Sequence, residues 1–496
     1  MNRQLTRLAV ASMVLLVALV VATTYWQSWA AGGLQARQDN AIQQVAQLAV
    51  DRGLILGADG KKRFADDTGK RVNGQMFFTR RYPLHGLAAQ TVGYSTSVGS
   101  RTGLEASMND YLTGANTNLS NAFQHTLDRL GGGTVHGNNL VLTLKPAAQR
   151  LALSLLGTRC GAVVAMNPQS GAVYVMASSP TYDQNLIDKP GGYAKILKTK
   201  GDCGDSSALL NRATAGLFTP GSTFKMVTAA AALDSGAFTP DSRFHDPGYC
   251  IDYGKKVFNA SNPDQTGPER YGNPTLAQGF QHSINSVFCN VGEKIGAQTI
   301  LEYAKRFGFY SVPPLETPVN ERAASGLYVN GRTWFPKDPT QVDVGRLAFG
   351  QERMQVTPLQ MVLVASAIAN GGEVPRPYVV ERVVGPDGTI VSQTTPQMLG
   401  RAIKPETAAE LTQMMVSVVQ AGTGTAAQIP GVQVAGKTGT AETGVNRVYT
   451  AWFVCFAPAD NPRVAVAVVV EKQPNGFGGS VSAPIAKAVL EKLLNG

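Results

Sequence analysis

The sequence predicts an α+β fold built on one antiparallel sheet with helices packed against it. Residues 162–167 and 172–177 are short apolar runs on either side of Pro168-Gln169-Ser170-Gly171, which is the pattern of a hairpin. A second pair of strands, 450–457 and 464–470, lies near the C-terminus and is almost continuously apolar. Such runs are typical of strands buried on both faces. Because helical stretches separate the two pairs, we expect the first and last strands to pair in a single sheet.

The remaining elements follow from periodicity and turn residues. Residues from about 37 to 133 are mixed and rich in Asn-Gly and Asp-Gly turns, which indicates a small irregular domain of short strands. A strand-like run at 140–144 and a helix at 146–156 lead into the first hairpin. Further helices are predicted at residues 225–233, 276–282, 292–307, 358–369, 404–419 and 483–494.

Composition excludes several classes of protein. The chain has 496 residues, of which 44% are hydrophobic and 16% charged, so it is not a wholly disordered chain. Its 53 glycines and 27 prolines follow no G-X-Y period, which excludes collagen. Lys+Arg number 44 against 34 Asp+Glu, and the net charge of +10 favours a location near anionic lipid headgroups and cell-wall polymers. Basic clusters typical of nucleic-acid binding are not evident, so no nucleic-acid partner is predicted.

The N-terminus predicts a membrane anchor. Arg3 and Arg7 precede an uncharged stretch whose apolar part, residues 8–26, is about 28 Å long as a helix, close to the roughly 30 Å of a bilayer core. Because both arginines lie on the short side, the positive-inside rule places the rest of the chain outside the cytoplasm. The alternative is a cleaved signal peptide, since Ser28-Trp29-Ala30 resembles a cleavage site. We expect a single-pass protein of the cell membrane with a cytoplasmic tail at 1–7, an anchor at 8–30, a small pedestal domain at 31–145 and an extracytoplasmic main domain at 146–496.

The five cysteines form no metal or redox motif. They contain no C-x-x-C pair, and the five histidines are scattered, so no metal site is predicted. In an oxidising compartment they allow two disulfides with one thiol left over, in a connectivity that the spacing leaves open. Cys455 lies in an apolar run, which indicates a buried thiol. The other four are Cys160, Cys203, Cys250 and Cys289.

The first motif that carries chemistry is Pro220-Gly221-Ser222-Thr223-Phe224-Lys225, which leads into an Ala-rich helix. Ser222 and Lys225 are three residues apart and share a helix face, with their Cβ atoms about 5–6 Å apart. A neutral lysine at that spacing can remove the proton of a hydroxyl, if burial or nearby positive charge lowers its pKa from about 10.4 toward 7–8. The helix N-terminus also offers N–H groups to a developing oxyanion. Alone, S-x-x-K is weak, because an N-cap serine followed by a surface lysine is common.

Two further motifs offer complementary groups. Ser283-Ile284-Asn285 places a hydroxyl and a carboxamide two residues apart, suited to relaying a proton and holding a peptide-like substrate, although S-x-N alone commonly marks a cap or a turn. Gly436-Lys437-Thr438-Gly439-Thr440 follows an alternating segment, so a cation and two hydroxyls would line a strand as a carboxylate-binding group. Gly439 would let a substrate backbone approach that strand closely.

The third motif also matches the P-loop pattern G-x-x-x-x-G-K-[ST] over residues 431–438. A P-loop needs a strand before it and a helix directly after it. Here Pro430 precedes the segment, its positions alternate like a strand, and residues 439–444 are a poor helix start. Nucleotide binding is therefore not expected.

In the order Ser-x-x-Lys, Ser-x-Asn, Lys-Thr-Gly, the motifs resemble the signature of penicillin-binding proteins and serine β-lactamases. Upstream, Arg52-Gly53-Leu54-Ile55, Arg81-Tyr82-Pro83 and Gly103-Leu104-Glu105 are similar to the pedestal of class B, monofunctional penicillin-binding proteins. The resemblance implies a five-stranded antiparallel sheet flanked by helices, a small mixed pedestal domain and an N-terminal transmembrane helix. Between residues 140 and 495 it also rests on Asn167-Pro168, Tyr182-Asp183-Gln184-Asn185, Asn211-Arg212-Ala213, Phe349-Gly350-Gln351, Thr357-Pro358-Leu359-Gln360 and Gly422-Thr423-Gly424.

The resemblance implies a peptidoglycan D,D-transpeptidase that crosslinks stem peptides and is acylated by β-lactams. Carried onto this chain, it makes Ser222 the nucleophile that attacks the D-Ala-D-Ala carbonyl, Lys225 its general base, and Ser283 the group that passes the proton to the leaving amine. No metal or cofactor is implied. The substrate would be held by Asn285, Lys437, Thr438, Gly439 and Thr440, and the backbone N–H groups of Ser222 and Thr440 would form the oxyanion hole.

Several alternatives stay open. A D,D-carboxypeptidase passes the same acyl group to water, and the motifs do not show which acceptor is used. A β-lactamase of this fold carries Ser-Asp-Asn where this chain has Ser283-Ile284-Asn285, and a β-lactam sensor typically has several membrane spans. A non-catalytic scaffold of the division complex would not depend on Ser222. The partners implied by the resemblance are stem peptides and lipid-linked precursors of peptidoglycan, β-lactam antibiotics, the membrane, a multi-span glycan polymerase and divisome proteins.

Overall fold

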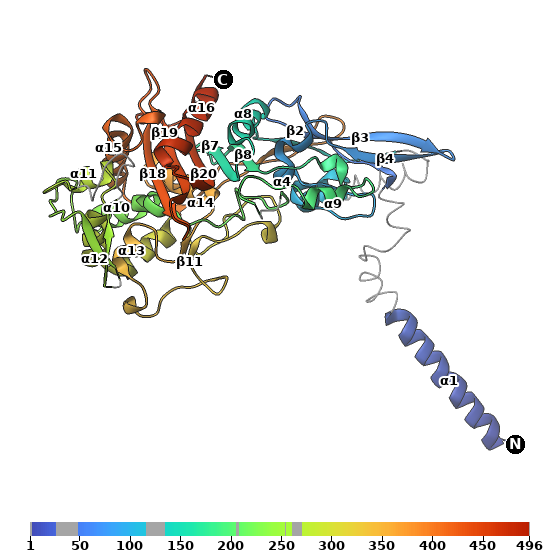
Figure 1. The fold of residues 1–496 in the computed structure, drawn as a ribbon. Coiled ribbons are helices and arrows are strands. Elements are labelled where there is room, and N and C mark those ends of the chain that lie inside the picture. Colours follow the sequence, from blue (N-terminus) through green and yellow to red (C-terminus); the bar gives the residue numbers. More distant parts are fainter. Residues whose placement is uncertain are drawn as a thin grey trace.

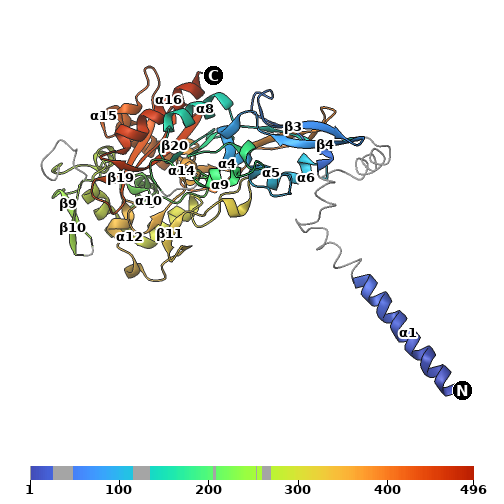
Figure 2. The same cartoon turned by 45° about the vertical axis from the view of Figure 1, so that its right-hand side comes forward.

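In a computed structural model, the chain forms an N-terminal helix, a pedestal with a six-stranded sheet and a larger domain with a five-stranded sheet (Figure 1). The structure describes residues 2–25, 48–115, 134–204, 208–252, 254–259 and 270–495. Helix α1 (Asn2–Thr24) stands apart from the rest (Figure 2). Its Thr6–Thr24 stretch has 19 residues with mean hydropathy 2.1 and buries none of its surface, so it is long and apolar enough to cross a membrane. Residues 26–30 of the predicted anchor lie outside the described residues.

The five-stranded sheet confirms the predicted pairing of the two hairpins. Its strand order is β18-β19-β20-β7-β8, and every neighbouring pair is antiparallel. The C-terminal β20 lies beside the N-terminal β7, with Val468 opposite Val163. The strands are β7 (Gly161–Met166), β8 (Val173–Ser179), β18 (Ala435–Glu442), β19 (Val448–Ala457) and β20 (Val464–Pro474).

Both faces of the central strands are buried, which explains their unbroken apolar sequence. Along β19, Trp452, Val454 and Phe456 face the core shared with α14 (Pro358–Ala369). The intervening residues, of which Cys455 is one, face a second core under the two helices α8 (Pro146–Leu156) and α16 (Ala483–Leu494). Because side chains alternate between the faces of a strand, two cores require apolar residues at consecutive positions.

Most predicted helices form where expected, and one begins earlier. The predicted segments 146–156, 358–369 and 483–494 are helical over those bounds. Helix α12 (Asn285–Arg306) was predicted to begin at 292, and that start is wrong by seven residues. Gly296 (φ 80°) interrupts it, and the turns before this break are buried on several sides, so they lack the amphipathic period that marks a helix. The remaining predicted helices are α10 (Lys225–Asp234), α11 (Leu276–Gln281) and α15 (Pro405–Ala421).

The pedestal sheet takes strands from two distant parts of the chain. Its order is β16-β15-β6-β2-β3-β4, so β15 (Val380–Val384) and β16 (Ile390–Gln393) join strands from the first 142 residues. The sequence prediction had not anticipated this, because pairing between such distant segments leaves no local pattern. The N-terminal members are β2 (Ile55–Leu56), β3 (Arg63–Val72), β4 (Gln75–Arg81) and β6 (Asn139–Leu142).

Shorter elements connect these layers, and two disulfides cross-link the larger domain. The bonds join Cys160 to Cys203 and Cys250 to Cys289, while Cys455 is a buried free thiol. The shorter elements are β1 (Val50–Asp51), α4 (Ala89–Val92), α5 (Gly103–Ser107), α6 (Asn109–Leu112), β5 (Val135–His136), α9 (Gly192–Leu197), β9 (Tyr249–Asp252), β10 (Lys255–Phe258), β11 (Gly326–Val329), β12 (Arg332–Thr333), α13 (Val344–Ala348), β13 (Met354–Gln355), β14 (Glu373–Pro375) and β17 (Met398–Arg401).

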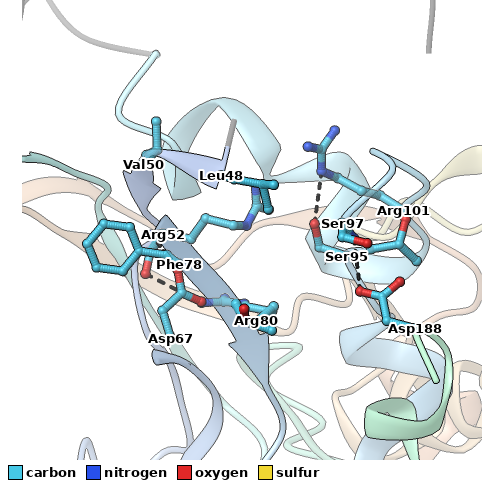
Figure 3. A pocket seen from close by; sticks show the side chains of 12 residues that line it. Leu48, Val50, Arg52, Asp67, Phe78, Arg80, Ser95, Ser97, Arg101 and Asp188 are labelled. Carbon is cyan, nitrogen blue, oxygen red and sulfur yellow. Dashed lines mark hydrogen bonds and ion pairs between the residues drawn. The ribbon is translucent and has the colours of Figure 1, made fainter. Parts of the chain in front are cut away.

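A buried ion cluster holds the pedestal together. Glu105 on α5 is fully buried, and its carboxylate accepts from Arg52 Nη2 at 2.7 Å and from Arg80 Nε at 2.5 Å. Arg80 also bonds Asp67 at 3.0 Å, and Figure 3 shows Arg52, Asp67 and Arg80 together at the wall of a cavity of about 40 Å³. Burial acts to raise the pKa of Glu105, but the two guanidiniums outweigh it and hold the pKa below its usual value.

Glu105→Gln is expected to lower the free energy of unfolding by about 3–5 kcal/mol, because it leaves the buried guanidinium of Arg52 without its anion and leaves Arg80 with Asp67 alone. Chemical denaturation measures the change in a fragment without the anchor, residues 37–496, which is called the soluble domain below. Arg81→Ala is the control on β4, next to Arg80. Arg81 pairs with Asp66 but is 56% exposed, so this variant should lower the free energy of unfolding much less than Glu105→Gln does. Equal losses in the two variants would contradict the role given to Glu105.

Candidate active site

The Ser-x-x-Lys motif lies in a tight turn at the start of α10. Gly221–Phe224 forms a 3-10 turn, and α10 begins at Lys225. Residues three apart share a face in both a 3-10 turn and an α-helix, so Ser222 and Lys225 lie on the same face. Ser222 is half-buried, whereas the Lys225 side chain is fully buried. The turn therefore keeps a hydroxyl at the surface of the site with an amine behind it.

Two glycines allow this turn to sit between β18 and the loop at Gly350. Gly221 has φ 52°, and a Cβ on it would lie 2.8 Å from the carbonyl oxygen of Thr440. Gly350 has φ 78°, and its Cβ would lie 2.3 Å from the carbonyl oxygen of Gly221. The N–H of Gly221 donates to the carbonyl of Gly350 at 3.1 Å. Side chains larger than hydrogen would push the nucleophile turn away from the strand.

The Ser-x-Asn motif binds Lys225. The Nζ of Lys225 donates to the carbonyl oxygen of Ser283 at 2.7 Å, to Asn285 Oδ1 at 2.8 Å and to Ser283 Oγ at 3.3 Å. Ser283 has φ 59°, a left-handed conformation that is uncommon for a residue other than glycine. Burial, together with the charge of Lys437, holds the pKa of Lys225 well below its usual value. This is the condition under which a lysine acts as a base.

The third motif brings a second buried lysine to the same hydroxyl. Lys437 Nζ on β18 donates to Ser283 Oγ at 2.9 Å and to the carbonyl oxygen of Thr438 at 3.2 Å. Burial lowers the pKa of Lys437 from 10.5 to about 7. That difference corresponds to about 5 kcal/mol against the charged form. Among the described residues neither Lys225 nor Lys437 pairs with a carboxylate, so an incoming anion finds an uncompensated cation.

Strand β18 is the free edge of the sheet beside the motifs. Thr440 is half-buried, and Thr438 Oγ1 lies 2.5 Å from Thr423 Oγ1. A Cβ on Gly439 would lie 2.8 Å from the Pro220 carbonyl oxygen, so packing against the nucleophile turn already requires glycine there. An edge strand can pair with an extended peptide. The strand runs through Gly436-Lys437-Thr438 with no helix after it, which confirms that the segment is not a P-loop.

Three supporting residues were not among the predicted site residues. Thr423 contacts Thr438, and the indole Nε1 of Trp452 donates to the carbonyl of Thr219 at 3.0 Å, which ties β19 to the nucleophile turn. A Cβ on Gly478 would lie 2.5 Å from the Gly439 carbonyl oxygen. Of these three residues, only Thr423 could have been found from the sequence, because Gly422-Thr423-Gly424 is one of the segments that resemble the family.

Residues 161–491 match the model of the penicillin binding protein transpeptidase domain. The chain belongs to the penicillin-binding protein transpeptidase family. Residues 52–140, which lie in the pedestal, match the model of the penicillin binding protein A dimerisation domain. The class B resemblance and the α+β fold are thereby confirmed.

Relatives of this family cover the whole chain. It is 34% identical to peptidoglycan D,D-transpeptidase PbpA of Mycobacterium tuberculosis, over 100% of both chains, and to PbpA of Mycolicibacterium smegmatis, over 100% of this chain and 99% of the relative. Penicillin-binding protein A from M. tuberculosis, solved as a penicillin G acyl-enzyme complex, superposes with a TM-score of 0.76 at 33% identity, covering 90% of this chain and 100% of that one. A D,D-transpeptidase domain from Eggerthella lenta gives 0.75 at 33% identity, covering 90% and 99%.

Proposed function

We propose that this chain is a peptidoglycan D,D-transpeptidase that works through an acyl-enzyme on Ser222 and is acylated by β-lactams. The observation that carries the proposal is the convergence of all three motifs on one hydroxyl, Ser283 Oγ, between the buried amines of Lys225 and Lys437. Two relatives that match this chain over its full length are named peptidoglycan D,D-transpeptidase, which supports the proposal.

In the proposed acylation step, neutral Lys225 removes the proton of Ser222 Oγ. The oxygen attacks the penultimate D-Ala carbonyl, and the C–O bond forms as the peptide C–N bond breaks. Backbone N–H groups of Ser222 and Thr440 stabilise the oxyanion. Ser283 then relays the proton from protonated Lys225 to the departing D-Ala amine, so Lys225 is neutral again and the stem-peptide acyl group remains on Ser222.

In the same scheme, the substrate carboxylate lies against protonated Lys437, helped by the hydroxyls of Thr438 and Thr440. Asn285 holds the substrate amide, and the edge of β18 at Gly439 pairs with the peptide backbone. An acceptor amine attacks the ester and loses its proton to Lys225, and the new C–N bond forms as the C–O bond to Ser222 breaks. Lys225 then returns that proton to Ser222 Oγ, which releases the crosslinked product and restores the enzyme. No metal or cofactor takes part in these steps.

The rate of acylation by penicillin G should follow a bell-shaped pH profile. The second-order rate constant of acylation, k2/Ks, rises with pH as Lys225 loses its proton. It falls again as Lys437 becomes neutral, and the midpoint of this alkaline limb should lie near pH 7. In Lys437→Arg the alkaline limb should disappear up to about pH 9, because a guanidinium keeps its charge. Stopped-flow acylation measures both profiles, and a wild-type rate that stays level from pH 7 to 9 contradicts the role of Lys437.

A thioester analogue of the donor tests the activity and separates it from D,D-carboxypeptidation. With a D-amino acid added, the soluble domain should divert acyl groups from water to the amine in proportion to the amine concentration. Release of acid alone at every amine concentration would favour the carboxypeptidase. No turnover by a protein that still binds penicillin covalently would favour a non-catalytic scaffold or sensor.

We also propose a single-pass topology with the division made from the sequence: tail 1–7, anchor 8–30, pedestal 31–145 and transpeptidase domain 146–496. Strands β15 and β16, which lie within this last range, complete the pedestal sheet. The exposed apolar side chains of α1 support the anchor. A multi-span glycan polymerase and divisome proteins are the proposed partners at the anchor and pedestal. Crosslinking from introduced photoreactive residues in α1 should capture a membrane protein, and release of the chain from membranes by carbonate would contradict the anchor.

A further inference from the structure

A buried carboxylate lies behind the Ser-x-Asn motif, on a part of the chain that no motif marks. Asp246 is 3% exposed and lies in the segment that connects α10 to α11. Its Oδ1 accepts from the N–H of Gly248 at 2.8 Å and from Asn259 Nδ2 at 3.0 Å, and its Oδ2 accepts from the N–H of Tyr271 at 2.9 Å. The carboxylate thus gathers three parts of this segment onto one point.

The same carboxylate fixes the residue that follows the motif. Ser286 Oγ donates to Asp246 Oδ1 at 2.6 Å, and the Ser286 N–H donates to Asn259 Oδ1 at 3.1 Å. Ser286 is fully buried and lies next to Asn285, whose Oδ1 accepts from Lys225. The hydroxyl and the backbone N–H of Ser286 are therefore held by the Asp246–Asn259 pair, in the first turn of α12.

The cluster also reaches the residue that precedes the motif. The ring of Tyr271 stacks on His282, with centroids 5.0 Å apart and planes 26° apart, while the Tyr271 N–H is bonded to Asp246. His282 is followed directly by Ser283, which has a positive φ. The clamp formed by Asp246, Asn259, Tyr271 and Ser286 thus contacts the motif on both flanks.

We propose that Asp246 is a positioning residue for the transpeptidase site, which sets the places of Ser283 and Asn285 through this clamp. A residue in the left-handed region stays there only when its surroundings hold it. The carboxylate accepts these hydrogen bonds best when ionised, and they hold its pKa below the usual value although burial acts to raise it. Displacing the motif would take the Ser283 hydroxyl and the Asn285 carboxamide away from Lys225. The inference rests on the proposed function, because the reaction supplies its readout.

The test compares acylation by penicillin G of the full chain, purified in detergent, in Asp246→Asn, Ser286→Ala and wild type. Asp246→Asn keeps the shape but places an N–H₂ group among donors, and k2/Ks should fall by about 10- to 100-fold, the cost of misplacing reacting groups by about 1 Å. Ser286→Ala removes one donor and should lower k2/Ks by about three- to tenfold. In a Ser283→Ala background, Asp246→Asn should lower the remaining rate by a smaller factor than in the wild type, because one of the two groups it positions is gone.

Asp234→Asn is the matched control. Asp234 is 7% exposed and accepts from Tyr303 Oη at 2.9 Å, Thr407 Oγ1 at 2.9 Å and the Lys404 N–H at 2.7 Å, but it lies at the far end of α10. This variant should lower the melting temperature and leave k2/Ks within about twofold of wild type.

A purely structural role for Asp246 predicts another pattern. Asp246→Asn would then reduce the fraction of protein that penicillin can titrate, while the titratable fraction reacts at the wild-type rate, and that result overturns the proposal. Equal losses in the wild-type and Ser283→Ala backgrounds overturn it as well. If Asp246→Asn does not fold, Ser286→Ala decides, and an unchanged rate there refutes the clamp. A wild-type protein that is not acylated would count against the proposed function instead.

Discussion

Ser222→Ala is expected to form no covalent adduct with penicillin G and to lose acyl transfer from a thioester donor by about five to six orders of magnitude. The reason is chemical, because without Oγ no ester can form at the mouth of the site. The fold should survive, since Ser222 is half-buried and its backbone is set by Gly221 and Gly350. Intact-protein mass spectrometry and thioester turnover measure the two losses, and thermal unfolding should shift little.

Ser235→Ala provides the matched control for this variant. Ser235 follows the other end of α10, where its hydroxyl donates to the carbonyl of Ala231 at 2.6 Å. This variant should be acylated at the wild-type rate. A covalent adduct of wild-type yield on Ser222→Ala would show that another residue is the nucleophile.

Lys225→Arg should lower the acylation rate by about 10³- to 10⁴-fold, because a guanidinium keeps its proton and cannot act as a base. The corresponding change at the second lysine, Lys437→Arg, should cost only about tenfold, since a carboxylate-binding role needs charge alone. Comparing the two variants distinguishes the general base from the carboxylate-binding group, because the same substitution is made at two fully buried lysines.

Stopped-flow acylation at pH 7 by penicillin G, with circular dichroism as a check on folding, measures both arginine variants. The outcome that contradicts the assignment is a smaller loss in Lys225→Arg than in Lys437→Arg. Equal losses would mean that both amines carry the same role. Substitution by methionine gives a second comparison, in which both variants should be inactive because each removes a buried amine.

The large domain was predictable where burial leaves a local pattern. Strands β19 and β20 are apolar at consecutive positions because two cores enclose them, and α14 begins at Pro358 after the capping Thr357, whose side chain accepts from the N–H of Gln360. The pedestal sheet was not predictable in the same way. Its strand β15 comes from residues 380–384 and pairs with β6. Short strands with many polar residues have too weak a pattern to predict such a pairing.

The site was predicted as a set of residues but not as a network. Spacing places Ser222 and Lys225 on one face, yet only the fold shows that Ser283 Oγ lies 2.9 Å from Lys437 Nζ and 3.3 Å from Lys225 Nζ. The hydrogen bonds of Asp246 join segments up to 40 residues apart, so no short motif contains them. Polar residues that support a site from behind are therefore found only once the tertiary structure is known.

The central claim is that Ser222 is the residue acylated in this transpeptidase. The most direct measurement is peptide mapping by mass spectrometry of the wild-type soluble domain after brief incubation with penicillin G. We expect one adduct, with the mass of the intact antibiotic, on the peptide that contains Ser222. An adduct on any other residue, or a protein that remains unmodified while folded, would contradict the claim.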